Sequence, residues 1–324
     1  MALERSAGRS GRGNSFLTSA LRFAGYDLDC RSEAPSPESN PSKAGAVSAG
    51  GRYMHTLPAD VEPARALLEE YSGIPADDVD RHVYQMRDRL WDVYPYACVG
   101  RFRFVSLEFT TDAYYQVALF RLLRAQTESE SDENNKTRLL DVGCCVGQVL
   151  RKLAADGVDS ARLYGTDVEP RFLDIGYDLF RDRNKFKGGF VIGDLLKQGA
   201  GEDRLDALDG RMTFIHATSF FHLFTWGDQV RAATRMVRLL QPERRDAMIF
   251  GRQVGTTSPR DNGKAGSDKV YLHNANSWQM LWDEVGERTG TKWKTTMEPT
   301  ETIETGAGGV ESSLKKMSFC VLRG

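Results

Sequence analysis

Three aspartates end three successive predicted strands, in an order that suits a nucleoside ligand. Asp141 follows an apolar run, Asp167 closes ARLYGTD and Asp194 closes GGFVIGD. Ligands bind at the carboxyl ends of the strands in an open parallel sheet, where an acid after the second strand accepts hydrogen bonds from ribose hydroxyls. An acid after the third strand can accept from an adenine amino group. The sequence therefore predicts a nucleoside site, with Val168 against the adenine and Leu195 closing the ring's other face.

The turn after the first of these strands indicates which ligand fits. Residues 141–147 read DVGCCVG, so the pattern is Asp-x-Gly-x-x-x-Gly rather than the Gly-x-Gly-x-x-Gly of a dinucleotide site. Gly143 and Gly147 let the backbone turn sharply beside a ligand, and the next helix offers free N–H groups. Asp141 would repel a pyrophosphate but attract an amino group and a sulfonium. The alternative is a purely structural role, in which the three acids only cap turns and helices.

Two adjacent cysteines, Cys144 and Cys145, lie inside this turn and could serve a metal, a redox switch or neither. The chain has five cysteines, an odd number without a disulfide framework. A zinc site usually needs two pairs of ligands a few residues apart, and here one adjacent pair stands alone. We therefore expect reduced thiols that act as small apolar fillers, and no metal.

An alternation of strands and helices positions these residues. Apolar runs predict strands, and apolar residues at i, i+3, i+4 and i+7 predict helices between them. The strands cover residues 137–143, 161–167, 188–194, 211–217, 246–254, 292–298 and 317–324, and the helices cover 148–157, 169–183, 227–240 and 277–290. The alternation predicts an α/β fold, a doubly wound and mostly parallel sheet with helices on both faces. The last two strands predict an antiparallel hairpin at the edge.

Three regions follow from the composition along the chain. Residues 1–56 are rich in Ser, Pro, Gly and Ala, which predicts a disordered tail or linker. Residues 57–137 carry three helical patterns, at 61–73, 75–91 and 112–126, and predict a helical cap over the site. Residues 138–324 form the ligand-binding domain.

The overall composition restricts partners and location. The chain of 324 residues is 40% hydrophobic and 27% charged, with a formal net charge of −2, as in ordinary globular proteins. A near-neutral chain has no global field that recruits nucleic acid or an anionic membrane. No stretch has the apolar length of a membrane span or a signal peptide, so a cytoplasmic location is expected. The sequence leaves open whether the chain forms a homodimer.

Three stretches make a family resemblance visible: LLDVGCCVGQVLRKLAADG, LYGTDVEPRFLDIGYDLFRDR and HATSFFHLFTWGDQV. They resemble the class I S-adenosylmethionine-dependent methyltransferases, and more narrowly the fungal methyltransferases of meroterpenoid biosynthesis. EEYSGIPADDVDRHVYQMRDRLWDVYPYACVGRFRF extends the resemblance through the cap, so it covers about residues 57–324.

The resemblance implies a Rossmann-like, seven-stranded sheet with one antiparallel strand near its edge, and S-adenosyl-L-methionine as cofactor. It also implies methyl transfer to an oxygen, most often the carboxyl of a prenylated aromatic polyketide acid with an apolar terpenoid part. Cys144 and Cys145 would then line the methionine end of the cofactor with their backbone.

The acceptor oxygen determines whether a base is needed. A carboxylate is ionised at neutral pH and needs none, whereas a phenol or alcohol needs one, for which histidine is the usual choice. His222, just beyond the fourth predicted strand, is the candidate for contact with the substrate or for general-base catalysis. The alternative is a histidine satisfied in a polar turn. His216 ends that strand, and either contacts the cofactor or only shapes the turn.

The cap and the late loops should supply the acceptor pocket. Arg101 or Arg103 could pair with an acidic substrate, although a basic surface face would give the same pattern. Apolar surface for a terpenoid tail is expected from the aromatic residues after the fourth strand, at least some of which must be ordinary core. They are Phe220, Phe221, Phe224 and Trp226.

Other function classes fit the sequence less well. A nicotinamide-dependent oxidoreductase would share the strand order, but the chain lacks Gly-x-Gly-x-x-Gly and a Tyr-x-x-x-Lys pair for hydride chemistry. A non-catalytic S-adenosylmethionine-binding subunit would not need the aromatic acceptor pocket. A hydroxyl O-methyltransferase of another secondary metabolite, with His222 as base, is the nearest alternative.

Overall fold

The computed structural model describes residues 53–128, 135–197, 204–257, 269–302 and 313–324. Most of the predicted tail and the connection between the last two strands lie outside these residues. The described part of the tail, residues 53–56, already contacts the cap: the Met54 N–H donates to the Gly100 carbonyl at 2.9 Å. Among the described residues, no helix is long and apolar enough to cross a membrane.

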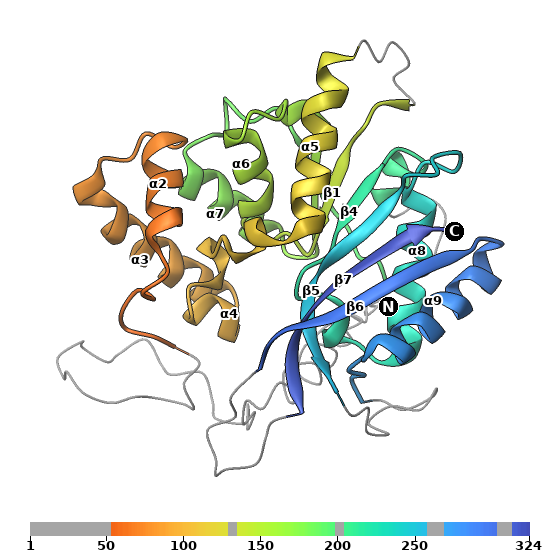
Figure 1. Ribbon diagram of the computed structural model, residues 1–324. Helices are drawn as coiled ribbons and strands as arrows, with labels where there is room; N and C mark the ends of the chain where they lie inside the picture. The colour runs from red at the N-terminus through yellow and green to blue at the C-terminus, as the bar shows by residue number, and fades with distance from the viewer. Residues whose placement is uncertain (1–52, 129–134, 198–203, 258–268, 303–312) are drawn as a thin grey trace, which may run out of the picture.

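Seven strands of the described residues form one sheet in the order β3-β2-β1-β4-β5-β7-β6 (Figure 1). The strands are β1 (Leu139–Val142), β2 (Leu163–Asp167), β3 (Gly189–Ile192), β4 (Phe214–His216), β5 (Met248–Thr256), β6 (Trp293–Thr302) and β7 (Leu314–Arg323). The first five are parallel, while β7 runs antiparallel to both β5 and β6. The predicted α/β architecture is confirmed, including the antiparallel pair at the edge.

Helices cover both faces of the sheet, because successive strand residues point to opposite sides. Leu139 of β1 joins the hydrophobic cluster under one set of helices, whereas Leu140 and Val142 join the cluster under the other. The first face carries α5 (Ala113–Thr127), α6 (Gln148–Ala155) and α7 (Pro170–Phe180), and the second carries α8 (Trp226–Leu239) and α9 (Ala275–Thr289). The sheet is therefore the middle of three layers.

Local sequence signals explain where these helices begin and end. Pro170 stands at the start of α7, and the Glu169 side chain accepts from the first-turn N–H of Arg171. Asn274 and Ser277 form a reciprocal capping box on α9, which ends at Gly290 with a positive φ of 67°. These helices are the ones that the sequence pattern predicts.

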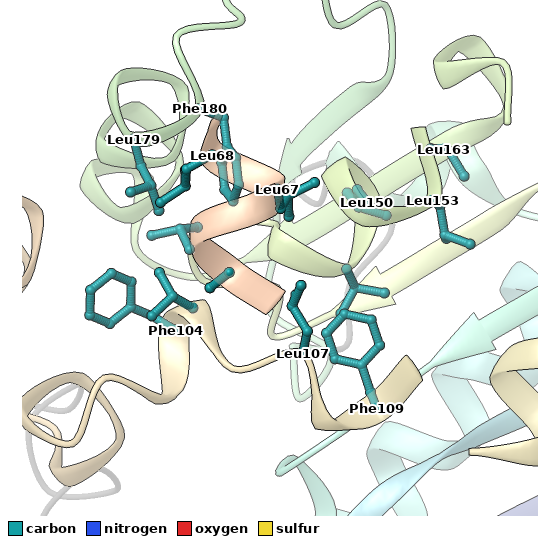
Figure 2. Packing of buried hydrophobic residues seen from close by; sticks show 14 of the residues in the cluster. Leu67, Leu68, Phe104, Leu107, Phe109, Leu150, Leu153, Leu163, Leu179 and Phe180 are labelled. Atoms are coloured by element: carbon teal, nitrogen blue, oxygen red, sulfur yellow. The ribbon is translucent and has the colours of Figure 1, made fainter. Parts of the chain in front are cut away.

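The cap packs on the first face through α2 (Glu62–Glu70) and α3 (Ala76–Val93). Leu67 and Leu68 of α2 lie in one hydrophobic cluster with Leu179 and Phe180 at the end of α7 (Figure 2). A short α4 (Ala97–Gly100) and two 3-10 turns, η1 (Arg103–Val105) and η2 (Glu108–Thr111), lead from the cap to α5. The sequence pattern did not predict these three short elements. Further 3-10 turns are η4 (Ser160–Arg162), η5 (Arg204–Leu208) and η6 (Phe221–Leu223).

A buried ion pair links the cap to the ligand-binding domain. Arg151 of α6 and Asp182 after α7 are both fully buried, with Nε 2.9 Å from Oδ2. The Tyr71 hydroxyl, just after α2, donates to the same Oδ2 at 2.9 Å. Because a buried charge is costly without partners, this set holds the cap in one position on α6 and α7.

Candidate active site

The glycine turn after β1 forms a tight loop at the carboxyl edge of the sheet, in which Gly143 is exposed and Gly147 is buried. Gly143 and Gly147 have φ of +65° and +68°, a region that favours glycine. The Cys144 N–H donates to the Thr166 carbonyl of β2, and the Gly147 N–H donates to the Cys144 carbonyl at 2.7 Å. A Cβ on Gly143 would meet the Phe220 ring at 3.4 Å. The turn and the residues after β4 thus lie side by side.

The two cysteines of the turn have thiols that suit packing rather than chemistry. Cys144 is buried, and its Sγ lies 2.9 Å from the position a Cβ on Gly165 of β2 would take. Burial raises the pKa of both thiols well above the ordinary value, so both stay protonated at neutral pH. Over the described residues, no group of three or more His, Cys, Asp or Glu side chains could hold a metal ion.

Asp167 at the end of β2 is bound by the turn beside it. Its Oδ2 accepts from the Cys145 N–H at 2.9 Å, and its Oδ1 accepts from the Glu169 N–H at 3.1 Å. Burial raises the pKa of this carboxyl. Val168 next to it is 56% exposed, an uncovered apolar side chain beside a half-buried acid. This pair suits a ribose and an aromatic base.

The third acid lies in a turn of its own. Asp194 is half-buried after β3, and its Oδ1 accepts from the Leu196 N–H at 3.0 Å. Leu195 was expected to lie against a bound ring, and the structure buries it instead at 5% exposure. It belongs to the hydrophobic cluster that includes Leu205 and Leu208, because the turn at Asp194 directs the chain inward.

Asp141 is the start of a buried hydrogen-bond chain. His216 Nδ1 lies 2.7 Å from Asp141 Oδ1, and His216 Nε2 lies 2.7 Å from Thr218 Oγ1. The Arg252 N–H donates to the same Oγ1 at 3.1 Å. With a neutral imidazole, one set of proton positions satisfies every donor from Arg252 to Asp141. Both nitrogens of His216 are thereby engaged, so this residue orients Asp141 rather than offering a free nitrogen to a ligand.

His222, unlike His216, has a ring nitrogen without a hydrogen-bond partner among the described residues. It lies in η6, and this nitrogen, Nδ1, is buried. Burial lowers its pKa to about 4, so the imidazole is neutral at physiological pH. An unpaired buried polar atom costs free energy unless a ligand satisfies it. Of the two candidate histidines, His222 is the one that can still bind.

The aromatic residues after β4 divide into two groups. Phe220 and Phe224 are half-buried with ring centroids 4.9 Å apart, on the side of the glycine turn. Phe221 is fully buried against Trp278 and Phe319, so the structure assigns it to the core, contrary to the predicted role in substrate binding. Phe221 begins the 3-10 turn η6, and its side chain points inward to these two rings.

Trp226 and the two cap arginines also have partners other than a substrate. The Trp226 Nε1–H donates to Glu284 Oε2 at 2.7 Å, which ties the start of α8 to α9. Arg103 forms a half-exposed pair with Glu108 at 2.7 Å. With Arg101 it lines a hollow of about 170 Å³ beside Met54. The contacts of Trp226 and Arg103 therefore do not support a substrate role, and the role of Arg101 stays a prediction.

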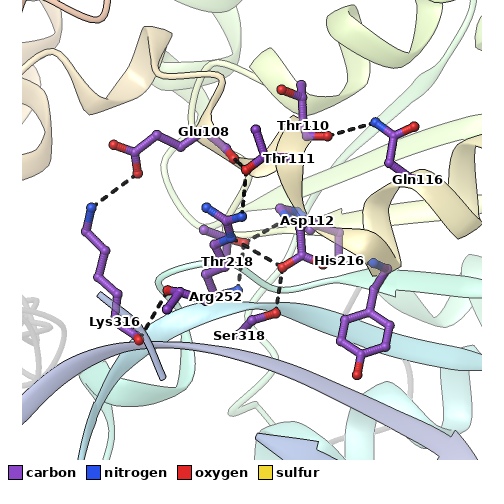
Figure 3. Close-up of polar contacts among 12 residues, drawn as sticks. Glu108, Thr110, Thr111, Asp112, Gln116, His216, Thr218, Arg252, Lys316 and Ser318 are labelled. Carbon is purple, nitrogen blue, oxygen red and sulfur yellow. Dashed lines mark hydrogen bonds and ion pairs between the residues drawn. The ribbon is translucent and has the colours of Figure 1, made fainter. Parts of the chain in front are cut away.

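Two groups of residues near the site escaped the sequence pattern. Tyr96 immediately precedes α4, where burial, Tyr94 and then Asp167 raise its pKa, and Cys98 is an exposed residue within α4. Arg252 and Asp112 form an ion pair between β5 and the start of α5 (Figure 3). An arginine that follows the apolar run AMIFG, near the carboxyl end of the predicted strand, was the available signal for Arg252.

These residues fit a nucleoside with a cationic amino-acid tail. Gly143 offers exposed backbone at the turn, Val168 an uncovered apolar surface and Asp167 a carboxylate. Asp141 would supply negative charge for an ammonium or sulfonium. The set would hold S-adenosylmethionine. Arg151 reaches the turn at the Val146 carbonyl, but it is buried and paired with Asp182, so it is not available to a pyrophosphate.

Comparisons with known proteins agree with this geometry. Residues 52–105 match the family model of the meroterpenoid methyltransferase N-terminal domain, and residues 139–243 match that of a methyltransferase domain. The chain is 38% identical to the O-methyltransferase phiE of Fungal sp. (strain ATCC 74256), over 78% of this chain and 81% of that protein. It is 39% identical to the O-methyltransferase atr3 of Stereocaulon alpinum, over 76% of this chain and 68% of that protein. It is 37% identical to the asnovolin E/chermesin D methyltransferase nvfJ of Aspergillus novofumigatus, over 71% of this chain and 78% of that protein.

Proposed function

The chain belongs to the S-adenosylmethionine-dependent methyltransferases of the fungal meroterpenoid type, and we propose that it forms a methyl ester on the carboxyl of a prenylated aromatic polyketide acid. The family membership makes it an O-methyltransferase of secondary metabolism. The carboxyl acceptor and the prenylated skeleton are the proposed part.

S-adenosylmethionine supplies an activated methyl group, so the chain has to hold, orient and dehydrate the reactants. In the proposed site, Asp167 accepts from the ribose hydroxyls and Val168 lies against the adenine. Asp194 accepts from the adenine amino group, and Asp141, fixed by His216, faces the positive methionine end. Phe220 and Phe224 provide the apolar wall for the prenyl part of the acceptor.

The burial of His222, whose Nδ1 has no partner among the described residues, is the observation that favours a carboxyl acceptor, because burial lowers the pKa of the imidazole. A base whose conjugate acid has a pKa of about 4 is weak against a phenol, whose pKa is about 10. A carboxylic acid has already lost its proton at neutral pH and needs no base. His222 then acts by offering a hydrogen bond from its ring to the ionised acceptor, which also satisfies the buried imidazole.

A methyl-transfer assay across matched acceptors tests the proposal. The panel pairs prenylated hydroxybenzoic acids with the phenols that lack only the carboxyl group, and mass spectrometry locates the added methyl. We expect methyl esters from the acids and little product from the phenols. Methyl ethers formed equally well from both series would contradict the carboxyl acceptor and favour a hydroxyl one.

A further inference from the structure

We infer that Arg252 binds the carboxylate of the acceptor and sets the preference of the enzyme for acids. The inference rests on the proposed carboxyl methylation and adds the residue that recognises the charge. Arg252 lies on β5, at the carboxyl edge of the sheet and on the face that carries the cap. It was absent from the residues that the sequence predicted for this role.

Hydrogen bonds connect the backbone of Arg252 to the cofactor end of the site. Its N–H donates to Thr218 Oγ1, which bonds His216, which in turn bonds Asp141. The Ser219 N–H donates back to the Arg252 carbonyl at 2.7 Å, in the loop that continues to Phe220 and His222. Arg252 is therefore fixed relative to Asp141 and to the candidate acceptor residues.

The guanidinium of Arg252 is only partly engaged. Its Nη2 donates to the neutral Thr111 Oγ1 at 3.0 Å, and its Nε contacts Asp112 Oδ2 at 3.3 Å (Figure 3). Nη1 has no partner among the described residues, and the side chain is 19% exposed. Because a guanidinium offers five donors in a planar fork, an edge remains available for a bidentate carboxylate.

Asp112 does not depend on Arg252 for its own hydrogen bonds. Its Oδ1 accepts from the Tyr114 N–H at 2.9 Å as the cap of α5, and its Oδ2 accepts from Ser318 Oγ at 2.5 Å. The longest of its three contacts is the one to Arg252. A second carboxylate can therefore share the arginine without leaving Asp112 unpaired.

Neighbouring cations are less available. Lys316 of β7 is held between two glutamates, with Nζ 3.3 Å from Glu108 and 2.6 Å from Glu301. Arg103 is paired with Glu108 at the surface of the cap. Among the described residues, Arg252 has one carboxylate neighbour, Asp112, which two other groups already satisfy. Arg252 is therefore the cation of this cluster best able to attract an acidic acceptor.

A purely structural role predicts a different pattern of variants. If Arg252 only ties β5 to α5, then Arg252→Gln and Asp112→Asn break the same contact and change the enzyme in the same direction. If Arg252 binds the acceptor, Asp112→Asn removes a competing carboxylate and leaves the charge of Arg252 free, while an asparagine still caps α5. Only Arg252→Gln then raises KM for an acid, whereas Asp112→Asn leaves it unchanged or lowers it.

The experiment measures KM and kcat for the prenylated hydroxybenzoic acid on which the wild type is most active. We expect Arg252→Gln to raise KM about 10- to 100-fold, as loss of a charge-assisted hydrogen bond predicts, and Arg252→Lys to recover part of this loss. Asp112→Asn should leave KM unchanged or lower it. Calorimetry with S-adenosylhomocysteine should give the same affinity for all four proteins.

Each other outcome has a defined meaning. An unchanged KM in Arg252→Gln, or a parallel rise in both variants, overturns the inference while the methylation of acids stands. A loss of S-adenosylhomocysteine affinity in Arg252→Gln would assign the arginine to the cofactor carboxylate instead and also overturn it. If the wild type methylates none of the acids, the proposed function itself fails, and the inference fails with it.

Discussion

His222 has a free nitrogen and a lowered pKa, and together these make its chemical role measurable. Because its pKa is about 4, the imidazole stays neutral from pH 6 to 8.5. Its ability to donate one hydrogen bond is therefore the same over this range. A carboxylate acceptor is also fully ionised over this range. We therefore expect the methyl-transfer rate of the wild type to be nearly flat between pH 6 and 8.5.

The variant His222→Asn keeps a donor of similar reach and should lower kcat/KM by at most about tenfold, or ~1.4 kcal/mol. General-base catalysis would instead lose about 10²- to 10⁴-fold in the same variant. Rates at saturating cofactor, measured at several pH values for both proteins, distinguish the two roles. A loss in the upper range would show that His222 removes a proton and would favour a hydroxyl acceptor.

Asp167 offers a second test at the residue scale. Asp167→Ala removes the proposed acceptor for the ribose hydroxyls and also frees the Cys145 N–H of the turn. We expect S-adenosylhomocysteine to bind about 1–3 kcal/mol more weakly by calorimetry. Asp174→Asn, an exposed acid on α7, is the matched control and should bind normally. Equal affinity in the Asp167 variant would remove this residue from the cofactor site.

The sequence predicts single residues well where the backbone alone determines their position. Asp141, Asp167 and Asp194 lie at the carboxyl edge of the sheet as predicted, because the carboxyl ends of parallel strands meet there, and their role in cofactor binding stays a prediction. Leu195 and Phe221 were assigned incorrectly, since the inward or outward direction of a side chain in an irregular loop depends on packing. The sequence has no comparable periodic signal there.

Helices and strands with a regular spacing of apolar residues were also predictable, whereas the short connecting turns were not. The sheet strands and α5 to α9 follow apolar patterns that extend over two or more turns or a complete strand. The segment from α4 to η2 is built from turns of three or four residues, for which the apolar pattern is too short. This segment nevertheless brings Tyr96 and Asp112 to the site.

The packing of α7 against the glycine turn gives a prediction at the element scale. A Cβ on Gly176 would lie 2.5 Å from the Val146 carbonyl oxygen, a backbone atom of the turn that cannot rotate away. Gly176→Ala must therefore push α7 and the turn apart, at a cost of about 1–3 kcal/mol in stability. Denaturant unfolding should show the loss, and cofactor affinity should fall with it.

Gly227→Ala is the control for helix propensity, because its Cβ would meet nothing within 4 Å at the start of α8. This variant should match the wild type or be slightly more stable. If Gly176→Ala were as stable as Gly227→Ala, the contact between α7 and the turn would not be tight in solution.

For the whole molecule, the family resemblance and the architecture predicted from the sequence are confirmed. Residues 52–105 match the N-terminal domain of meroterpenoid methyltransferases and residues 139–243 match a methyltransferase domain, while a cap over the site stays a prediction. What the sequence could not reveal is the way distant segments meet. The buried pair joins Arg151 of α6 to Asp182, 31 residues further on and just after α7, and Tyr71 reaches it from the cap. No local pattern marks such partners, because each is an ordinary polar residue on or just beyond its own helix.

A buried histidine between the two helices of the second face makes the stability of the molecule depend on pH. His273 is fully buried, with Nε2 2.9 Å from Gln229 Oε1 and Nδ1 3.0 Å from Ser277 Oγ. The amide nitrogen of Gln229 donates to two carbonyls, so its oxygen accepts from His273. Burial lowers the pKa of His273 to about 3.

In the unfolded chain the same histidine has a pKa near 6.5. Below that value the unfolded state takes up a proton that the folded state refuses until about pH 3, so the free energy of unfolding falls as the pH falls through this window. At pH 5 this one group should cost about 2 kcal/mol relative to pH 7.5. His222, with a pKa of about 4, adds an effect of the same sign.

Urea unfolding of the wild type and of His273→Gln at pH 7.5, 6 and 5 tests the assignment. The glutamine variant should be less stable at pH 7.5, because it loses the fit between Gln229 and Ser277, but its stability should fall less steeply toward pH 5. The difference between the two proteins should therefore shrink by about 2 kcal/mol over this range. Parallel curves would mean that the folded and the unfolded states take up this proton equally. That result would contradict a lowered pKa for His273 in the folded state.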